Sequence, residues 1–266
     1  MRRNALAAGL LLAATSALAP HAPSRAQQAP AERRPGDGTE WGYAGPSGPE
    51  HWAELSANHK VCAEGAQESP IDLRGGVPAK LGDLRIEWRP VPLRVANTGH
   101  SIQVDAPPGG RLVMEGRTYE LLQFHLHHPS EHLLDGRRFP MEIHFVHSGP
   151  GNGVLGVVAV FVEHGAPNEA LEAVLANMPA EPGASREAAD ARATVQPHRL
   201  LPAGRDFLRY EGSLTTPPCS ENVDWAVLTQ PIQASPAQVD ALARLYPSNA
   251  RPLRPLHRRS LLRSER

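Results

Sequence analysis

The feature that most constrains this chain is a stretch in which histidines alternate with other residues. Residues 119–126 are rich in aromatic and aliphatic side chains, a composition typical of a β-strand. Successive side chains of a strand point to opposite faces, so residues i and i+2 share a face. Gln123, His125 and His127 are therefore predicted to lie on one face of this strand.

A second strand is predicted a short distance further along, at residues 141–147. By the same alternation, Glu142 and His144 lie on one face of it. The polar residues between the two strands include Asp135 and Gly136, a pair typical of a tight hairpin turn. If the strands pair in antiparallel fashion, the histidines of the first strand and the histidine of the second converge on one point.

Three imidazoles brought together in this way predict a zinc site. Zinc accepts neutral imidazole readily, and three protein ligands leave a fourth position for water, as in catalytic zinc sites. Gln123 and Glu142 stand where hydrogen-bond acceptors would fix the orientation of the ligand rings. The alternative is that these are strand histidines bonded to neighbouring polar groups. A single histidine would favour that alternative, whereas three with adjacent acceptors favour the metal.

The N-terminus has the layout of a signal peptide. Arg2 and Arg3 precede an apolar run, residues 5–19, that is too short to cross a membrane. Residues 1–26 are predicted as the signal, and residues 27–39 as a flexible lead-in. An uncleaved anchor is the less favoured alternative. The predicted location is periplasmic or secreted, with no integral membrane segment once the signal is removed.

The charge balance gives no support for nucleic acid as a main partner. Removing the signal would delete three arginines and no acidic residue, so 27 basic side chains become 24 against 28 acidic ones, a formal charge of −4. A nucleic-acid-binding domain typically carries a basic excess instead. Basic residues do cluster at 257–266, where a solvated C-terminal tail is predicted.

Cysteine usage bears on both the metal and the compartment. The chain has two cysteines, Cys62 and Cys219, which are too few for a Cys-based structural zinc site. Export to an oxidising compartment favours a disulfide between them over two buried thiols.

The remaining pattern predicts a mainly β fold. Short runs rich in β-branched and aromatic residues are separated by Gly and Pro turns, and no repeat or second linker divides residues 40–256. We therefore predict a single domain built on a large, twisted, mostly antiparallel central sheet with small peripheral helices. Helices are expected at residues 50–58, 169–177, 185–193 and 235–245, the last with a Ser-Pro-Ala-Gln start typical of a capped helix.

A second constellation lies far along the chain, at residues 212–219. Thr215 and Thr216 precede two prolines, which make this loop rigid and extended. A threonine hydroxyl accepts a hydrogen bond from a metal-bound hydroxide only if its own proton is donated to another acceptor. Glu131, in the segment between the two histidine strands, is the candidate acceptor. The alternative for this residue is a solvated loop glutamate.

In this order the motifs resemble the α-class carbonic anhydrases, in their shorter, secreted bacterial form. The similarity covers roughly residues 40–256 and so nearly all of the mature chain. It extends to Trp41-Gly42-Tyr43, Gly48-Pro49-Glu50-His51-Trp52, Gln67-Glu68-Ser69-Pro70-Ile71-Asp72, Asn97-Thr98-Gly99-His100 and Asn249-Ala250-Arg251-Pro252. The resemblance implies the α-carbonic anhydrase fold and a Zn²⁺ cofactor whose ligands are His125, His127 and His144.

The resemblance also implies a role for each matching position. Glu131 and Thr215 would orient a zinc-bound hydroxide, His100 would carry the proton out, and Tyr43 would order water in the proton path. Thr216 would contact bound bicarbonate, and carbon dioxide would rest against an apolar wall. That wall comprises Val146, Val154, Leu214, Val223 and Trp225.

Around the ligands, the resemblance implies a supporting set of hydrogen bonds. Gln123 and Glu142 would accept from two of the ligand rings, and a backbone carbonyl near Asn249 would accept from the third. His132 looks like an extra ligand but would instead bond to Glu142 and Tyr210.

The implied activity is the zinc-dependent, reversible hydration of carbon dioxide to bicarbonate and a proton, by attack of zinc-bound hydroxide. One alternative is a non-catalytic binding module that kept the fold, which the complete set of ligand and orienting residues disfavours. Another is a zinc hydrolase acting on small esters, although the chain has no His-Glu-x-x-His signature. The expected partners are carbon dioxide and bicarbonate, and the formation of a homodimer is left open.

Overall fold

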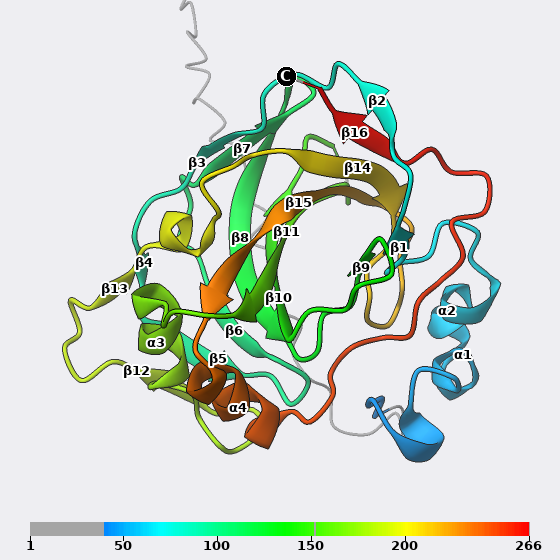
Figure 1. Ribbon diagram of the computed structural model, residues 1–266. Coiled ribbons are helices and arrows are strands. Elements are labelled where there is room, and N and C mark those ends of the chain that lie inside the picture. The colour runs from blue at the N-terminus through cyan, green and yellow to red at the C-terminus, as the bar shows by residue number, and fades with distance from the viewer. Residues whose placement is uncertain (1–39, 152, 266) are drawn as a thin grey trace, which may run out of the picture. The chain divides into compact units, whose positions relative to one another are not determined.

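The computed structural model describes residues 40–151 and 153–265 (Figure 1). The predicted signal peptide at 1–26 and lead-in at 27–39 lie outside these described residues. Within them, twelve strands form one sheet, and two further pairs of short strands lie beside it. Helices are short and lie at the periphery of the sheet (Figure 1).

The bounds of these elements follow. The strands are β1 (Asp72–Leu73), β2 (Val77–Ala79), β3 (Arg85–Glu87), β4 (Val91–Pro92), β5 (Arg94–Asn97), β6 (Ile102–Asp105), β7 (Arg111–Met114), β8 (Arg117–His127), β9 (Leu133–Leu134), β10 (Met141–Ser148), β11 (Leu155–His164), β12 (Ser185–Glu187), β13 (Thr194–Val195), β14 (Phe207–Gly212), β15 (Val223–Ala234) and β16 (Leu262–Ser264). The helices are α1 (Trp52–Leu55), α2 (Val61–Glu64), α3 (Glu169–Leu175) and α4 (Pro236–Leu245), with 3₁₀ turns η1 (Gly45–Ser47), η2 (Ala57–His59) and η3 (Pro197–Leu200).

The long strands β8, β10, β11 and β15 lie side by side at the centre of the sheet (Figure 1). β10 pairs with β8 on one side and with β11 on the other, both in antiparallel fashion. β11 and β15 are parallel, as are β16 and β2, whereas the other neighbours in the sheet are antiparallel. The predicted class, a single mainly β domain with a mostly antiparallel sheet, is confirmed.

Alternation along β10 separates the apolar core from the candidate site. Met141, Ile143 and Phe145 belong to the larger apolar cluster on one face of the sheet. Glu142 and His144 fall on the opposite face and are nonetheless buried. Because burying polar groups is costly unless they are hydrogen-bonded, this face must supply partners for both side chains.

The connection between β8 and β10 contains the predicted turn. Leu134 and Arg137 exchange backbone hydrogen bonds of 3.0 and 2.9 Å around Asp135 and Gly136. Both central residues have positive φ, 50° and 80°. This is the pattern of a type I′ turn, in which glycine adopts the left-handed conformation without steric cost.

Helices α3 and α4 lie next to each other, as Figure 1 shows, close to the predicted ranges 169–177 and 235–245. Asn168 caps α3, and Ser235 and Gln238 form a capping box at the start of α4. The Gln238 amide also donates a 2.9 Å hydrogen bond to the Asn168 carbonyl, which joins the two helix starts. Among the described residues, no helix combines the length and apolar character of a membrane span.

The prediction of a helix at residues 185–193 is wrong. Ser185–Glu187 form β12, which pairs in antiparallel fashion with β5 at the edge of the sheet. All three residues of β12 are polar and exposed, and the residues of this segment that pack against the larger apolar cluster, Ala188 and Ala193, follow the strand. Pairing with β5 instead satisfies the backbone groups of this segment.

The prediction of a solvated tail at 257–266 is also wrong for its second half. Leu262–Ser264 form β16, which lies between β14 and β2 in the sheet. The adjacent Leu261 is 5% exposed and packs in the smaller apolar cluster. The prediction of a solvated tail rested on the arginines of this segment. Its conformation is instead set by the burial of Leu261 and by pairing with the edge of β14.

Candidate metal centre

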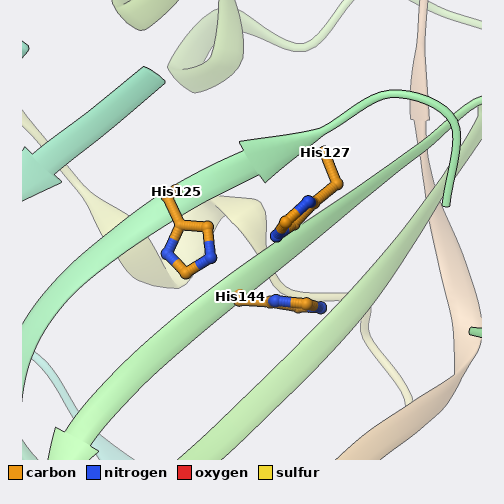
Figure 2. Close-up of side chains that lie close together, drawn as sticks. All are labelled: His125, His127 and His144. Atoms are coloured by element: carbon orange, nitrogen blue, oxygen red, sulfur yellow. The ribbon is translucent and has the colours of Figure 1, made fainter. Parts of the chain in front are cut away.

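Three histidine rings converge between β8 and β10. His125 and His127 lie two residues apart on β8, and His144 is the direct cross-strand partner of His125. Figure 2 shows the three rings pointing toward one another. One nitrogen from each ring lies within 4.8 Å of the corresponding nitrogens of the other two. The convergence follows from strand alternation together with the antiparallel register.

Hydrogen bonds fix which nitrogen of each ring faces the centre. In every case the other nitrogen contacts an oxygen that can only accept, so that nitrogen must carry the proton. The three bonds are His125 Nδ1 to Gln123 Oε1 (2.8 Å), His127 Nδ1 to the Asn249 carbonyl (2.7 Å) and His144 Nε2 to Glu142 Oε1 (2.8 Å). Two Nε2 lone pairs and one Nδ1 lone pair are thus directed at the centre.

The residues at this centre fit zinc. His127 Nε2 is buried and has no hydrogen-bond partner among the described residues, a costly arrangement unless a ligand binds there. Burial lowers the pKa of His125 well below its usual value, and the neighbouring His127 and His144 lower it further. Neutral imidazoles with inward lone pairs are the donors that zinc prefers, and three of them leave one position open.

Glu142 is the acceptor that organises this region. Its Oε1 accepts from His144 and from His132 Nδ1 (2.7 Å), and its Oε2 accepts from the backbone amides of Glu131 and His132 (2.8 Å each). Burial raises the pKa of Glu142, but electrostatic attraction from His132 and His144 and the hydrogen bonds from their rings bring the pKa well below its usual value. His132, Glu142 and His144 therefore form a hydrogen-bonded cluster in which the contacting nitrogens are already occupied.

Glu131 lies in the loop after β8 and is fully buried. Its Oε1 accepts a 2.8 Å hydrogen bond from the backbone amide of Arg251. Its Oε2 lies 3.5 Å from His127 Nε2 and 3.9 Å from His144 Nδ1, the two nitrogens that face the centre. This carboxylate is thus at the edge of the site and not in a solvated loop.

The loop after β14 presents Thr215 and Thr216. Thr215 is buried, and the Thr216 carbonyl accepts a 2.9 Å hydrogen bond from the amide of Cys219. Cys219 forms a disulfide with Cys62, which ties the loop to helix α2. No hydrogen bond joins Thr215 to Glu131 in the described part of the chain, so their pairing stays a prediction.

Most of the predicted apolar wall gathers in one cluster beside the histidines. Val146, Val223 and Trp225 are buried in it, and Leu214 packs against it. The Trp225 ring lies 4.9 Å from the ring of His144. An uncharged surface therefore adjoins the metal-facing nitrogens.

Val154 differs from the other wall residues. It precedes β11 and packs against the larger cluster, on the opposite face of the sheet. Val157 takes the corresponding place, since it is the cross-strand partner of Val146 and lies level with Trp225. Sequence reasoning missed Val157, although alternation along residues 155–164 could have indicated it.

His100 and Tyr43 lie near the aromatic residues of the N-terminal segment. The His100 ring stacks on Trp41, with centroids 3.6 Å apart and planes at 12°. The Tyr43 hydroxyl is buried without a hydrogen-bond partner in the described part of the chain. Burial raises the Tyr43 pKa well above its usual value, and the negative charge of Glu131 adds to this rise.

Comparison with known proteins places the chain in a family. A family model described as eukaryotic-type carbonic anhydrase matches residues 47–265. The carbonic anhydrase of Nostoc sp. is 41% identical over 227 residues, which cover 84% of this chain and 85% of that protein. The carbonic anhydrase of Neisseria gonorrhoeae is 40% identical over 229 residues, covering 85% and 89% of the two chains.

Solved structures agree with these relatives. The α-carbonic anhydrase of Thermovibrio ammonificans, in complex with the inhibitor sulfanilamide, is similar with a TM-score of 0.80 and 41% identity, covering 84% of this chain and 98% of that one. The chain belongs to the α-carbonic anhydrase family of enzymes, whose general reaction is the hydration of carbon dioxide. The family expected from the motifs is confirmed.

Proposed function

We propose that this chain catalyses the reversible hydration of carbon dioxide to bicarbonate and a proton, with Zn²⁺ held by His125, His127 and His144. The observation that carries the proposal is the set of three inward nitrogens, each fixed by an acceptor on the far side of its ring. Zinc at this position would lower the pKa of a bound water to near neutral and so supply hydroxide as the nucleophile.

The remaining roles belong to the protein's own side chains. Thr215 would accept a hydrogen bond from the nucleophile and donate its own proton to Glu131, which directs the attacking lone pair toward the substrate. The buried position of Glu131, 3.5 Å from His127 Nε2, supports this assignment. The apolar cluster around Val146 and Trp225 would hold carbon dioxide, because an uncharged molecule is not repelled by a dry apolar surface.

Product formation and proton transfer involve the rim of the site. Thr216, next to Thr215, would contact bicarbonate. His100 would move the proton to solvent, since imidazole titrates near neutral pH and exchanges protons with buffer. Tyr43, whose buried hydroxyl has no hydrogen-bond partner in the described part of the chain, would order the water between the two ends of this path.

We also propose a periplasmic or secreted location. The supporting features are the N-terminal signal-peptide pattern at residues 1–26 and the Cys62–Cys219 disulfide, a bond that persists in oxidising compartments.

Metal removal tests the proposed activity. We expect that chelated, metal-free protein will lose carbon dioxide hydration in a stopped-flow pH-indicator assay and regain it with one equivalent of Zn²⁺. Full activity without metal would overturn the proposal. Turnover of an activated ester in the same preparations separates the two alternatives. A binding module would hydrate no carbon dioxide when loaded with zinc, and an ester hydrolase would favour the ester.

A further inference from the structure

Arg251 and Glu68 form an ion pair that is buried away from solvent. Arg251 Nη1 lies 2.6 Å from Glu68 Oε2, and the two residues are only 2% and 1% exposed. The guanidinium also donates to the carbonyls of Ser69 (2.8 Å) and Cys62 (2.7 Å), and it lies 5.5 Å from the centroid of the Trp52 ring. An apolar pair could fill such a space at equal or greater stability, so the charges call for another explanation.

The segment that contains Asn249 and Arg251 contacts three parts of the site. The Arg251 amide donates to Glu131 Oε1 at 2.8 Å. The Asn249 backbone carbonyl accepts from His127 Nδ1, and the Asn249 side-chain Nδ2 donates to the His100 carbonyl at 3.0 Å. A shift of this segment would therefore move the orienting carboxylate and a ligand ring together.

The residue next to Glu68 reaches the threonine loop. Ser69 Oγ accepts from the Ser213 amide (3.1 Å), and the Ser69 amide donates to Ser213 Oγ (2.9 Å). Ser213 lies two residues before Thr215. Gly212 permits this approach, because a Cβ at that position would overlap Ser69 Oγ. Residues 68 and 69 thus hold Arg251 on one side and the Thr215 loop on the other.

We propose that the Glu68–Arg251 pair is a positioning pair for the reaction. The fork of the guanidinium holds residue 251 so that its amide N–H stays on Glu131, while Ser69 holds the loop that carries Thr215. The pair therefore sets Glu131 against Thr215 without touching the substrate. This inference rests on the proposed function, because it assigns the pair to the hydroxide-orienting step.

Variants at both residues test the proposal in the zinc-loaded full chain. Arg251→Met keeps the bulk of the side chain and removes its donors. Glu68→Leu removes the carboxylate, whereas Glu68→Gln removes its charge but keeps a polar side chain of the same size next to Arg251. Arg209→Met is the matched control, because it breaks another buried pair (Arg209 to Asp224, 3.0 Å). Among the described residues, the other hydrogen-bond and ion-pair partners of these two side chains are Glu115, Glu211, Arg117 and Tyr119, none of which is a proposed site residue.

We expect kcat/KM for carbon dioxide to fall about 10-fold in Arg251→Met and Glu68→Leu and about 3-fold in Glu68→Gln, as small displacements of orienting groups are costly. Weak-buffer kcat, limited by proton transfer, should fall less than kcat/KM. Arg209→Met should lose comparable thermal stability and keep kcat/KM within about 2-fold of wild type. All assays use folded protein with one zinc per chain, at a temperature below every unfolding transition.

The outcomes separate this inference from the proposed function. An inactive zinc-loaded wild type would overturn the proposed function. Active wild type with unchanged kcat/KM in Arg251→Met and Glu68→Leu would overturn the positioning role alone, as would an equal loss in Arg209→Met. If Arg251→Met or Glu68→Leu does not fold, Glu68→Gln decides, and kcat/KM equal to wild type in that variant would count against the pair.

Discussion

Glu142 Oε1 accepts a 2.8 Å hydrogen bond from His144 Nε2, and this contact makes Nδ1 the metal-facing nitrogen of that ring. His125 and His127 have the reverse arrangement, with Nδ1 bonded outward and Nε2 directed inward. The difference follows from where each acceptor lies relative to the strand. An acceptor behind a ligand ring fixes its tautomer and raises its basicity, so these outer contacts contribute to metal affinity.

Glu142→Gln should therefore weaken zinc binding about 10- to 100-fold. Each carboxylate oxygen accepts from two N–H groups, and glutamine offers one acceptor oxygen in place of two, so two of the four donors lose their partner. Competition with a chelator of known affinity measures the effect. Glu187→Gln, at an exposed position on β12, is the control and should bind zinc as tightly as wild type. Equal zinc affinity in the two variants would contradict the role given to Glu142.

His100→Ala should slow turnover in weak buffer by about 10- to 100-fold, because the side chain that relays the proton is lost. The value of kcat/KM, which reports the carbon dioxide step, should stay close to wild type. Small imidazole buffers should restore kcat. His164→Ala, at an exposed site at the end of β11, serves as the comparison and should behave as wild type. Unchanged weak-buffer turnover in His100→Ala would point to another proton route.

His147 gives the fold a dependence on acid. The ring is fully buried, Trp88 Nε1 donates to its Nε2 (3.0 Å), and its Nδ1 donates to the Gly156 carbonyl (3.0 Å). Burial lowers its pKa to about 4, and the hydrogen bond to Gly156 only partly opposes the shift. Protonation would place a charge in the core and remove the acceptor for Trp88.

The unfolded chain binds this proton more readily than the folded chain does. Neutral His147 therefore adds its full stabilisation to the fold above pH ~6.5. As the pH falls from there toward 4, the free energy of unfolding decreases by about 3 kcal/mol. Urea unfolding at several pH values measures it. His147→Gln cannot titrate, so its stability should change less over this range. Identical pH profiles for wild type and variant would refute the assignment.

The disulfide should stabilise the fold through the length of the loop it closes. Cys62 and Cys219 are separated by 157 residues, for which the chain-entropy model gives about 5 kcal/mol as an upper value. Replacing both cysteines with serine should lower the urea midpoint accordingly. Wild type measured in a reducing buffer should approach the variant, and a variant with an unchanged midpoint would exclude this contribution.

The local parts of the site could be predicted from the sequence. Alternation alone placed Gln123 with His125 and Glu142 with His144, because a strand fixes the direction of successive side chains. The tight turn at Asp135 and Gly136 could also be predicted, because an Asp-Gly pair favours a type I′ turn. These features depend on backbone geometry over a few residues, so the local sequence is sufficient to predict them.

The long-range contacts could not be predicted in the same way. His127 and the Asn249 carbonyl are 122 residues apart, and Glu131 and the Arg251 amide are 120 apart. The general position of the Asn249 contact came from resemblance to a family, and nothing local indicated the Glu68–Arg251 pair. The segment at 185–193 shows the opposite problem, since its composition suited a helix and the open edge of β5 decided its conformation.

The position of β16 also has a consequence for synthesis of the chain. Among the described residues, β2 joins the sheet only through β16, so residues 77–79 have no described neighbour in it until residues 262–264 have left the ribosome. Until then the edge of β14 on that side stays open, and an open strand edge is a template for pairing with another chain. A nascent or truncated molecule that lacks residues 262–264 would therefore carry two unpaired edges and a risk of aggregation that the intact sheet avoids.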